Sequence, residues 1–330
     1  MKKKGTFILM VFIVSFLCLG TGIANADSHV IKYYTDNDES ELDPFAKAIS
    51  KGTGLKLEPL RLSSGEAWAR VDAEAPRVGA DMHFGWPLSF AIMAKEKGLL
   101  MQYKSPAWKA IPSQYKDPDG YWYGWSYWFA CIGVNTKLLK EKGYSAPRSW
   151  KDLLDPKWKG EIVMPNPGTS GTAYLTVSTV MQLFGEDEGW KYLEQLNKNV
   201  AQYTKSGSAP GQLVAQGEYM IGITWDQAVE KRKNEGYPIE MVIPAEGTGY
   251  VLDIAVIYKN TENPEGAKKF IDYVGSKGFQ QEVAQYRSKV TYPGVESLVS
   301  FDPKLIDYDA KWAADNRTRI MSTWKSRFAQ

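Results

Sequence analysis

Apolar and polar positions follow a recurring order along this chain: a short apolar run, a polar loop, and then apolar residues at helical spacing. The first copy has an apolar run at residues 30–34, a loop at 35–40 and a helical face that includes Phe45 and Ile49. Similar runs begin at residues 55, 81, 162, 201 and 219. This order predicts an α/β fold whose sheets are mixed but mainly parallel and flanked by helices.

Three of the loops are rich in serine, threonine and glycine, and each stands between a predicted strand and a predicted helix. They contain Ser63, Ser64 and Gly65, then Thr169, Ser170, Gly171 and Thr172, and finally Ser206, Gly207 and Ser208. Free N–H groups and the helix dipole favour an anion at a helix start. An ordinary helix cap is the alternative for any one loop. Because ligands of α/β sheets bind at the carboxyl ends of strands, the repetition favours one shared anion site.

The first residues have the pattern of a secretory signal. A run of three lysines at 2–4 precedes an apolar stretch at 7–19 and the small-residue pattern of Ala24 and Ala26. We expect cleavage after about Ala26 and export to the periplasm. The alternative is an uncleaved membrane anchor, although the apolar stretch is shorter than the roughly 20 residues of a spanning helix.

Once the expected signal sequence is removed, 330 − 26 = 304 residues remain, and their composition limits the possible classes of function. Their formal charge is +2 − 3 = −1, which gives no support for nucleic-acid binding. They keep a single cysteine, Cys131, in an apolar context, so no internal disulfide is expected. A chain of this length favours two lobes over one core.

Several motifs taken together resemble one protein family. They lie at 63–66, 117–122, 134–139, 149–156, 165–173, 202–210 and 246–250. The chain resembles extracellular solute-binding proteins of ABC importers, in the branch related to ferric-iron-binding, hexose-phosphate-binding and phosphonate-binding periplasmic proteins. The resemblance implies a two-lobed type II periplasmic-binding-protein fold with the ligand in the interlobe cleft. It also implies a membrane permease of the ABC transporter as partner, and we expect a monomer.

The resemblance further implies how the chain is divided. Lobe 1 would comprise residues 27–128 and 250–300, and lobe 2 residues 129–249. Residues 301–330 would form C-terminal helices that pack on the body, with apolar positions at Ile306, Trp312, Ile320 and Trp324.

The same resemblance divides the expected site into two ends. The three loops would bind the anionic end of a small phosphorylated or phosphonated molecule, either a sugar phosphate or an aminoalkylphosphonate. The organic end would meet Thr35, Asp36, Trp86, Trp125, Trp225, Asp226, Tyr250 and Asp253. Aromatic faces can stack on a sugar or attract an amine. Trp122 and Trp128 are expected in the core, and Asp226 has a helix cap as its alternative role.

Two alternatives share this fold. Ferric-iron members of the family use an adjacent tyrosine pair where this chain has Trp225 and Asp226, so an iron site would need other tyrosines such as Tyr33, Tyr34 or Tyr250. A carrier of a quaternary amine in an aromatic cage is the second alternative. His83 is expected to be structural. We expect no metal, no cofactor and no catalysis, because the chain has no nucleophile or metalloprotease motif.

Overall fold

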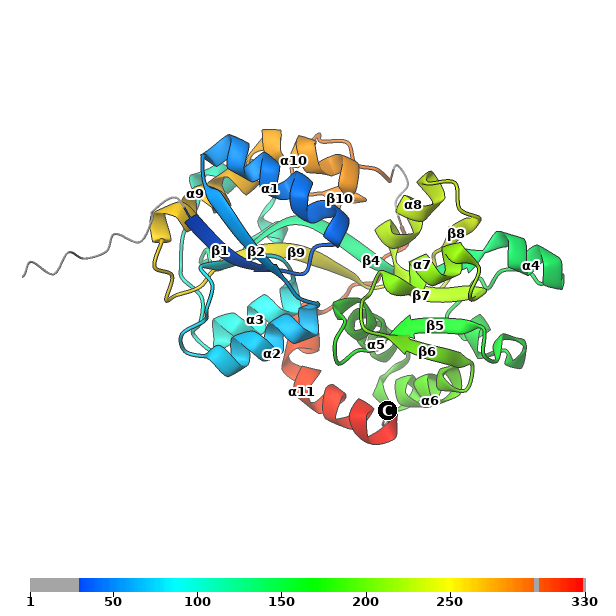
Figure 1. Cartoon of the computed structure of the whole chain (residues 1–330). Helices are drawn as coiled ribbons and strands as arrows, with labels where there is room; N and C mark the ends of the chain where they lie inside the picture. The colour runs from blue at the N-terminus through cyan, green and yellow to red at the C-terminus, as the bar shows by residue number, and fades with distance from the viewer. Residues whose placement is uncertain (1–29, 300–302, 329–330) are drawn as a thin grey trace, which may run out of the picture.

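The computed structural model describes residues 30–299 and 303–328. The expected signal sequence lies outside these residues. Two halves, each built of a sheet between helices, sit side by side (Figure 1). This is the two-lobed α/β architecture that the sequence predicts. None of the described helices combines the length and apolarity needed to cross a membrane.

The first half contains the amino-terminal strands. Its strand order is β2 (Lys56–Arg61), β1 (Val30–Thr35), β3 (Met82–Pro87), β9 (Tyr250–Ile257) and β4 (Tyr123–Asn135). Strands β2, β1 and β3 are parallel, whereas β9 runs antiparallel to both β3 and β4. The carboxyl ends of β1 and β3 therefore meet at one edge, where they deliver the loop after β1 and the start of the helix after β3.

The second half repeats this arrangement. Strand β4 continues into it and pairs with β7 (Ile221–Trp225), which lies beside β5 (Ile162–Pro165) and β6 (Val200–Thr204). Strands β7, β5 and β6 are parallel, and β8 (Ile239–Val242) pairs antiparallel with β4. A short strand, β10 (Lys289–Val290), also pairs antiparallel with β4. Each antiparallel pair among the described strands includes β4 or β9, and local apolar patterns do not reveal this pairing.

Strand β4 belongs to both halves. The sequence suggested an aromatic run and a separate strand at 131–135, but these form one strand of 13 residues. Residues 123–129 of this strand pair with β9, and residues 130–135 pair with β7 and β8. Figure 1 shows β4 running from one half into the other. The lobe boundaries at 128/129 and 249/250 remain a prediction.

Helices cover both faces of each sheet (Figure 1). In the first half α1, α9 and α10 lie on one face and α2 and α3 on the other; in the second, α7 and α8 lie opposite α5 and α6. Their bounds are α1 Glu39–Thr53, α2 Ser64–Glu74, α3 Leu88–Glu96, α4 Thr136–Lys142, α5 Gly171–Phe184, α6 Glu186–Asn197, α7 Ala209–Gln216, α8 Asp226–Asn234, α9 Pro264–Val274 and α10 Lys277–Val283. Short 3-10 helices span Pro106–Ala110, Ser113–Tyr115, Lys151–Leu154, Pro156–Trp158 and Ala284–Tyr286.

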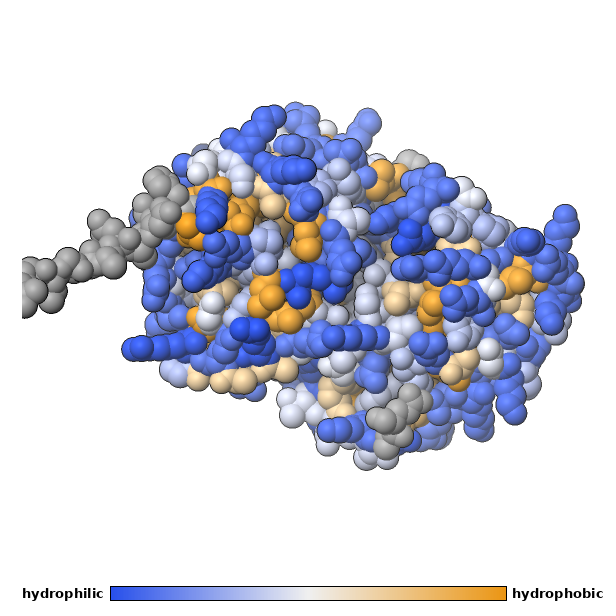
Figure 2. All heavy atoms as spheres, viewed as in Figure 1, coloured by the Kyte–Doolittle hydropathy of each residue, from blue (hydrophilic) through white to orange (hydrophobic). Residues whose placement is uncertain are grey.

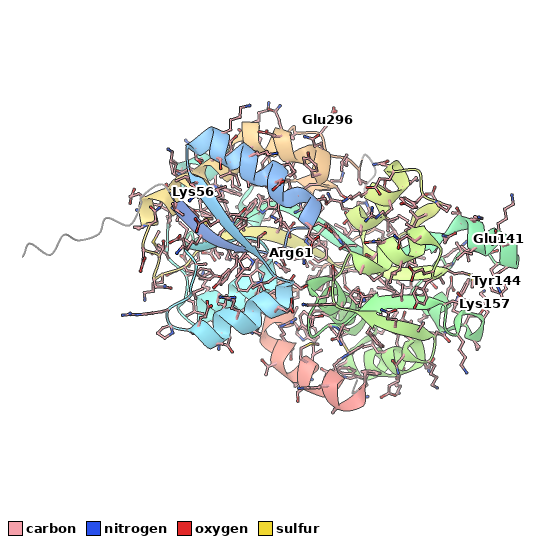
Figure 3. All side chains as sticks on the ribbon, in the orientation of Figure 1. Lys56, Arg61, Glu141, Tyr144, Lys157 and Glu296 are labelled. Carbon is pink, nitrogen blue, oxygen red and sulfur yellow. The ribbon has the colours of Figure 1, made fainter. Side chains whose placement is uncertain are left out.

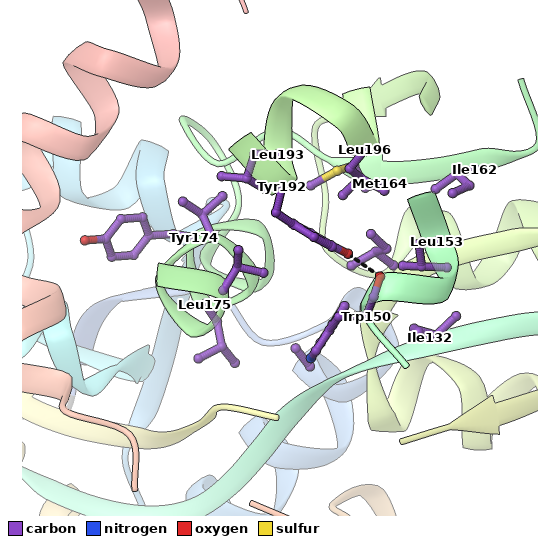
Figure 4. Packing of buried hydrophobic residues seen from close by; sticks show 14 of the residues in the cluster. Ile132, Trp150, Leu153, Ile162, Met164, Tyr174, Leu175, Tyr192, Leu193 and Leu196 are labelled. Atoms are coloured by element: carbon purple, nitrogen blue, oxygen red, sulfur yellow. Dashed lines mark hydrogen bonds between the residues drawn. The ribbon is translucent and has the colours of Figure 1, made fainter. Parts of the chain in front are cut away.

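Each half has its own apolar core. In the second half Trp150 is fully buried, and Tyr192 donates its hydroxyl to the carbonyl of Trp150 at 2.7 Å (Figure 4). In the first half Phe45 and Phe84 pack on Trp125. Burying each such side chain contributes about 1.5–3 kcal/mol. Separate cores allow each half to keep its shape while the space between them changes.

The carboxyl-terminal segment contains one described helix, α11 (Ala310–Arg327), where the sequence suggested several. Ile306 lies before it, and its amide donates to the carbonyl of Thr248 at 3.0 Å. Helix α11 reaches both halves: Lys311 pairs with Glu96 of α3 at 2.9 Å, and Arg327 pairs with Glu194 of α6 at 2.6 Å.

Candidate functional site

Two of the serine- and threonine-rich loops meet inside the second half. Ser170 caps α5 by accepting the amide of Ala173 at 3.4 Å. A side chain at Gly207 would place its Cβ 2.3 Å from the Oγ1 of Thr172 and 3.0 Å from the Oγ of Ser170. Glycine is therefore required at 207 for the second loop to approach the first. The cap takes the amide of Ala173, whereas the amides of Gly171 and Thr172 have no acceptor within the helix and remain available to a ligand.

The third loop, from the first half, closes against the other two. The amide of Gly65 donates to the carbonyl of Thr169 at 3.0 Å, and Glu66 pairs with Lys205 at 2.8 Å. A Cβ on Gly171 would lie 2.7 Å from the Oγ of Ser64. These contacts join the halves, so the structure has its cleft closed.

The three loops border a cavity of about 60 Å³ between the halves. Most polar groups on its wall are hydroxyls and carboxylates. The lining residues are Asp36, Asn37, Asp38, Arg61, Ser63, Ser64, Gly85, Trp128, Ser170, Gly171, Thr172, Ser206, Gly207, Ser208, Trp225, Asp253 and Arg287. Arg61 lies at the end of β2 nearest the second half (Figure 3).

Eleven residues named from the sequence are among these lining residues: eight from the three loops, together with Asp36, Trp225 and Asp253. Two further loop residues stand behind the wall. Gly65 contacts the Thr169 carbonyl, and Thr169 donates its hydroxyl to the carbonyl of Lys205 at 2.9 Å. Their hydrogen bonds hold the loops to one another.

The other expected residues of the organic end do not line the cavity. Thr35 is buried behind the loop that follows β1, where its hydroxyl accepts the amide of Asn37 at 3.2 Å. Trp86 is fully buried and stacks on His83, with ring centroids 4.3 Å apart. Tyr250 borders a different hollow. A strand-to-helix turn thus does not by itself direct an aromatic side chain into the cleft, because the apolar face of Trp86 is drawn to the core.

Trp125 and Asp226 are buried close to the cavity without lining it. Trp125 belongs to the core of the first half. Asp226 is fully buried as the first residue of α8 and makes no side-chain cap of that helix. Burial raises its pKa to about 7.

Arg287 is the main lining residue that the sequence did not suggest. Its Nη2 donates to Asn37 Oδ1 at 2.7 Å and lies 2.9 Å from Glu41 Oε2, and its Nη1 donates to Gln227 Oε1 at 3.2 Å. Its guanidinium carbon lies 4.9 Å from the centre of the Trp125 ring. In the sequence, Arg287 follows a short helix and belongs to no motif, so it would be interpreted as a solvent-exposed surface residue. Only the fold shows that it lies at the cavity.

Two carboxylates, those of Asp36 and Asp253, also line the cavity. Asp253 accepts from Trp128 Nε1 at 2.7 Å and from Ser126 Oγ at 3.1 Å. Ser64 donates its hydroxyl to Asp36 Oδ2. Burial, and then the negative charge of Asp253, raise the pKa of Asp36 well above its usual range. Burial likewise raises the pKa of Asp253.

Trp128 belongs to the core of the second half, as expected, and it also borders the cavity, where its indole N–H donates to Asp253. Its ring meets that of Trp225 edge to face, with centroids 5.8 Å apart. The alternation of residues along a strand placed Trp128 opposite Trp125, and the two do face different cores. The alternation of side chains along a strand could not show that one face of β4 borders the cleft.

Comparison with known proteins decides the family. Residues 81–314 match the family model of the bacterial extracellular solute-binding proteins. This chain belongs to that family. The binding protein is 35% identical over 322 residues to an uncharacterized protein of Haemophilus influenzae, and the match covers 92% of each chain. Its class is therefore that of periplasmic solute-binding components of ABC-type import.

Two further relatives carry names that mention a ligand. The structure of AfuA from Actinobacillus pleuropneumoniae, with exogenous fructose-6-phosphate bound, superposes with a TM-score of 0.86 at 34% identity, over 90% of this chain and 98% of that one. A putative 2-aminoethylphosphonate-binding periplasmic protein of Salmonella paratyphi A is 26% identical over 329 residues, 92% of this chain and 95% of its own. The expected fold and family are thereby confirmed.

The tyrosines named for an iron site do not come together at the cavity. Tyr33 is buried in the core of the first half, and Tyr34 donates its hydroxyl to Glu74 at 2.8 Å. Residues 30–299 and 303–328 contain no cluster of three or more histidine, cysteine, aspartate or glutamate side chains placed to hold a metal. His83 is fully buried, and its Nδ1 lies 3.2 Å from the Tyr258 hydroxyl.

Proposed function

We propose that this binding protein captures a small organic phosphate or phosphonate and delivers it to the permease of an ABC importer. The observation that carries the proposal is the convergence of three hydroxyl-bearing loops on one cavity between the halves. Three helices, α2, α5 and α7, begin at these loops. Helix starts and hydroxyls together suit a group with several anionic oxygens.

The chemistry of these loops favours reversible capture. Hydroxyl and amide donors are neutral, so they need no counter-ion when the cleft is open to water. Hydrogen bonds to a charged oxyanion contribute about 1.5–3 kcal/mol each. Several such bonds, made only when the halves close, would hold the ligand and keep the closed form populated. Ligands of this class are named for two relatives.

We further propose that the protein is exported with its signal cleaved after about Ala26, and that it acts as a monomer without cofactor or catalysis. The site residues of the anionic end are Ser63, Ser64, Ser170, Thr172, Ser206 and Ser208, with the amides of the glycines between them. Asp36, Asp253, Trp128 and Trp225 would meet the organic end.

Calorimetry with purified protein tests the proposal. We expect binding of at least one of fructose 6-phosphate, glucose 6-phosphate and 2-aminoethylphosphonate, unchanged by a chelator. Failure of all three, and of inorganic phosphate, would refute it. A charge-transfer colour with ferric citrate would support the iron alternative instead, and binding of choline would support the quaternary-amine alternative.

A matched pair of variants locates the anionic end. Thr172→Val keeps the β-branched shape and removes one hydroxyl, so affinity should fall by about tenfold to a hundredfold. Ser326→Ala removes an exposed hydroxyl of α11 and should leave affinity unchanged. Equal affinity in the two variants would exclude Thr172 from the site.

A further inference from the structure

Five flat side chains stack on one another in a row that crosses from the first half to the second. The rings of His83 and Trp86 have centroids 4.3 Å apart, those of Trp86 and Phe90 have centroids 5.4 Å apart, and the planes differ by only 4° and 5°. The guanidinium carbon of Arg317 lies over two rings, 4.4 Å from the Phe90 centroid and 4.3 Å from the Tyr174 centroid. We call this row the cross-half stack.

The stack passes from one half to the other at the contact between Phe90 and Arg317. Trp86 and Phe90 lie at the end of β3 and in α3, and they belong to a core cluster of the first half. Arg317 lies in α11, which packs in the core of the second half, where the Tyr174 hydroxyl of α5 donates to the carbonyl of Ala313. Arg317 and Tyr174 therefore move together with the second half, and Phe90 moves with the first.

Aromatic rings hold most of the Arg317 guanidinium. The residue is 4% exposed, and its Nη1 is buried without a hydrogen-bond partner among the described residues. Burial lowers its pKa to about 10, so the group remains charged at neutral pH. Because a guanidinium is weakly hydrated, covering its face with a ring costs little and gains a cation–π attraction. The contact with Phe90 therefore favours the closed arrangement of the halves.

The stack also supports one hydroxyl-bearing loop from each half, although neither Trp86 nor Arg317 lines the cavity. The Nε1 of Trp86 donates to the carbonyl of Ser64 at 3.5 Å, and the Nη2 of Arg317 donates to the carbonyl of Pro167 at 3.5 Å. Ser64 lines the cavity, and Pro167 comes three residues before Ser170, which lines it as well. The stack therefore joins the two loops from outside the cavity.

A second contact between α3 and α11 responds differently to movement. Lys311 pairs with Glu96 at 2.9 Å, and the two side chains are 61% and 52% exposed. Long exposed side chains can follow a relative movement of the two helices. The flat groups of Phe90 and Arg317 are buried and in direct contact, so rotation of the halves separates them.

We propose that Arg317 is a positioning residue that clasps Phe90 when the halves close and thereby slows the release of the bound oxyanion. This inference rests on the proposed function, and it assigns to α11 a part in ligand binding from outside the cavity. The clasp forms only after the ligand has entered the cleft. It therefore lengthens the lifetime of the complex and leaves the rate of capture unchanged.

Removal of the guanidinium tests the clasp. Stopped-flow fluorescence follows fructose 6-phosphate, glucose 6-phosphate or 2-aminoethylphosphonate, whichever calorimetry shows to bind. Arg317→Met keeps the length of the side chain and should raise the dissociation rate constant about tenfold, with the association rate constant nearly unchanged. Arg319→Met, at an exposed arginine of the same helix, is the matched control and should change neither constant. An unchanged dissociation rate in Arg317→Met would overturn the inference, and so would an equal fall in the association rate.

A variant in the other half keeps the test independent of any effect of Arg317 on folding. Phe90→Leu removes the ring from the first half and should raise the dissociation rate by a similar factor. If the two groups act through one contact, the double variant should release ligand no faster than either single variant. Additive effects on the dissociation rate would contradict the clasp.

The outcomes distinguish this inference from the proposed function. Binding by the unaltered protein, with no change of dissociation rate in Arg317→Met or Phe90→Leu, would overturn the clasp alone. Failure of the unaltered protein to bind any of the three compounds, or inorganic phosphate, would overturn both.

Discussion

The two walls of the cavity differ in how the chain builds them. The hydroxyl wall comes from three short loops, each continuous in sequence and each at the start of a helix. The acidic wall takes single residues from separate segments: Asp36 after β1, Trp128 from β4, Asp253 from β9 and Arg287 beyond α10. One wall is therefore set by local structure, and the other exists only after the whole fold has formed.

The walls also differ in what holds them. Hydroxyls and amides are neutral, so the first wall needs geometry alone. The second wall buries carboxylates around one guanidinium, which makes its stability depend on pairing and on protonation. We therefore expect changes in the acidic wall to affect folding first, and changes in the hydroxyl wall to affect ligand affinity first.

Removal of the Arg287 guanidinium should have the largest effect. Arg287→Met leaves Glu41 buried without its partner, so the free energy of unfolding should fall by about 3–5 kcal/mol. Chemical denaturation measures this change. Arg77→Met, at an exposed arginine, is the matched control and should lose little. Similar stability in the two variants would mean that the buried pair does not support the fold.

The dependence of stability on pH should come next in size. Burial raises the pKa of Glu41 from 4.5 to about 7, so the folded state holds its proton more tightly than the unfolded state does. The free energy of unfolding should therefore fall as pH rises from about 5 to 7, by at most about 3 kcal/mol from this group. Asp226, with a pKa of about 7, adds to the same trend. Glu41→Gln should flatten the dependence of the unfolding free energy on pH. An unchanged dependence would mean that groups other than Glu41 cause it.

On the hydroxyl wall, Gly207→Ala should act on affinity. The added Cβ would overlap the Thr172 hydroxyl, and relieving this overlap should cost about 1–3 kcal/mol, or roughly tenfold to a hundredfold in affinity. Gly278→Ala is the matched control, because a Cβ there meets nothing within 4 Å. Calorimetry with the best-binding phosphonate compares them. Normal affinity in Gly207→Ala would mean that the two loops do not bind the ligand together.

The ion pair between Glu66 and Lys205 joins two loops of the hydroxyl wall, one from each half, and breaking it should have the smallest effect. The lysine side chain is 70% exposed, so Lys205→Ala should cost at most about 1 kcal/mol of binding. High salt should remove the difference, since the pair is open to solvent. Lys191→Ala, which breaks a pair within α6, should not change affinity. A large loss of affinity in Lys205→Ala would mean that the lysine contacts the ligand directly.

The comparison also explains what the sequence could predict. The alternation of strands and helices, the family and the positions of the three loops were all readable, because each depends on neighbours in sequence. Asp253 and Trp225 were named through the resemblance, and both lie at the cavity.

Trp86, Trp128 and Arg287 show where sequence reasoning stops. Trp86 is buried instead of lining the cleft, and Trp128 lines the cleft as well as the core, because the pairing of β9 with β3 and β4 decides which face of a strand meets the cleft. Arg287 reaches the cavity through contacts with residues some 60 and 250 positions away in sequence. A local sequence pattern cannot predict contacts between residues so far apart in the sequence.

Strand β4 has a mechanical consequence. It passes from one sheet to the other without a loop, and its hydrogen-bonded neighbour changes between Phe129 and Ala130. There the amide of Ala130 donates to the carbonyl of Gly249, at the other crossing of the chain, at 3.2 Å. Rotation of the halves would then twist these two adjacent strands at this level, while α11 keeps its contacts with either half through flexible ion pairs at the surface. The rest of each sheet would turn as a unit, and deuterium uptake at the amide of Ala130 would report how often the cleft opens.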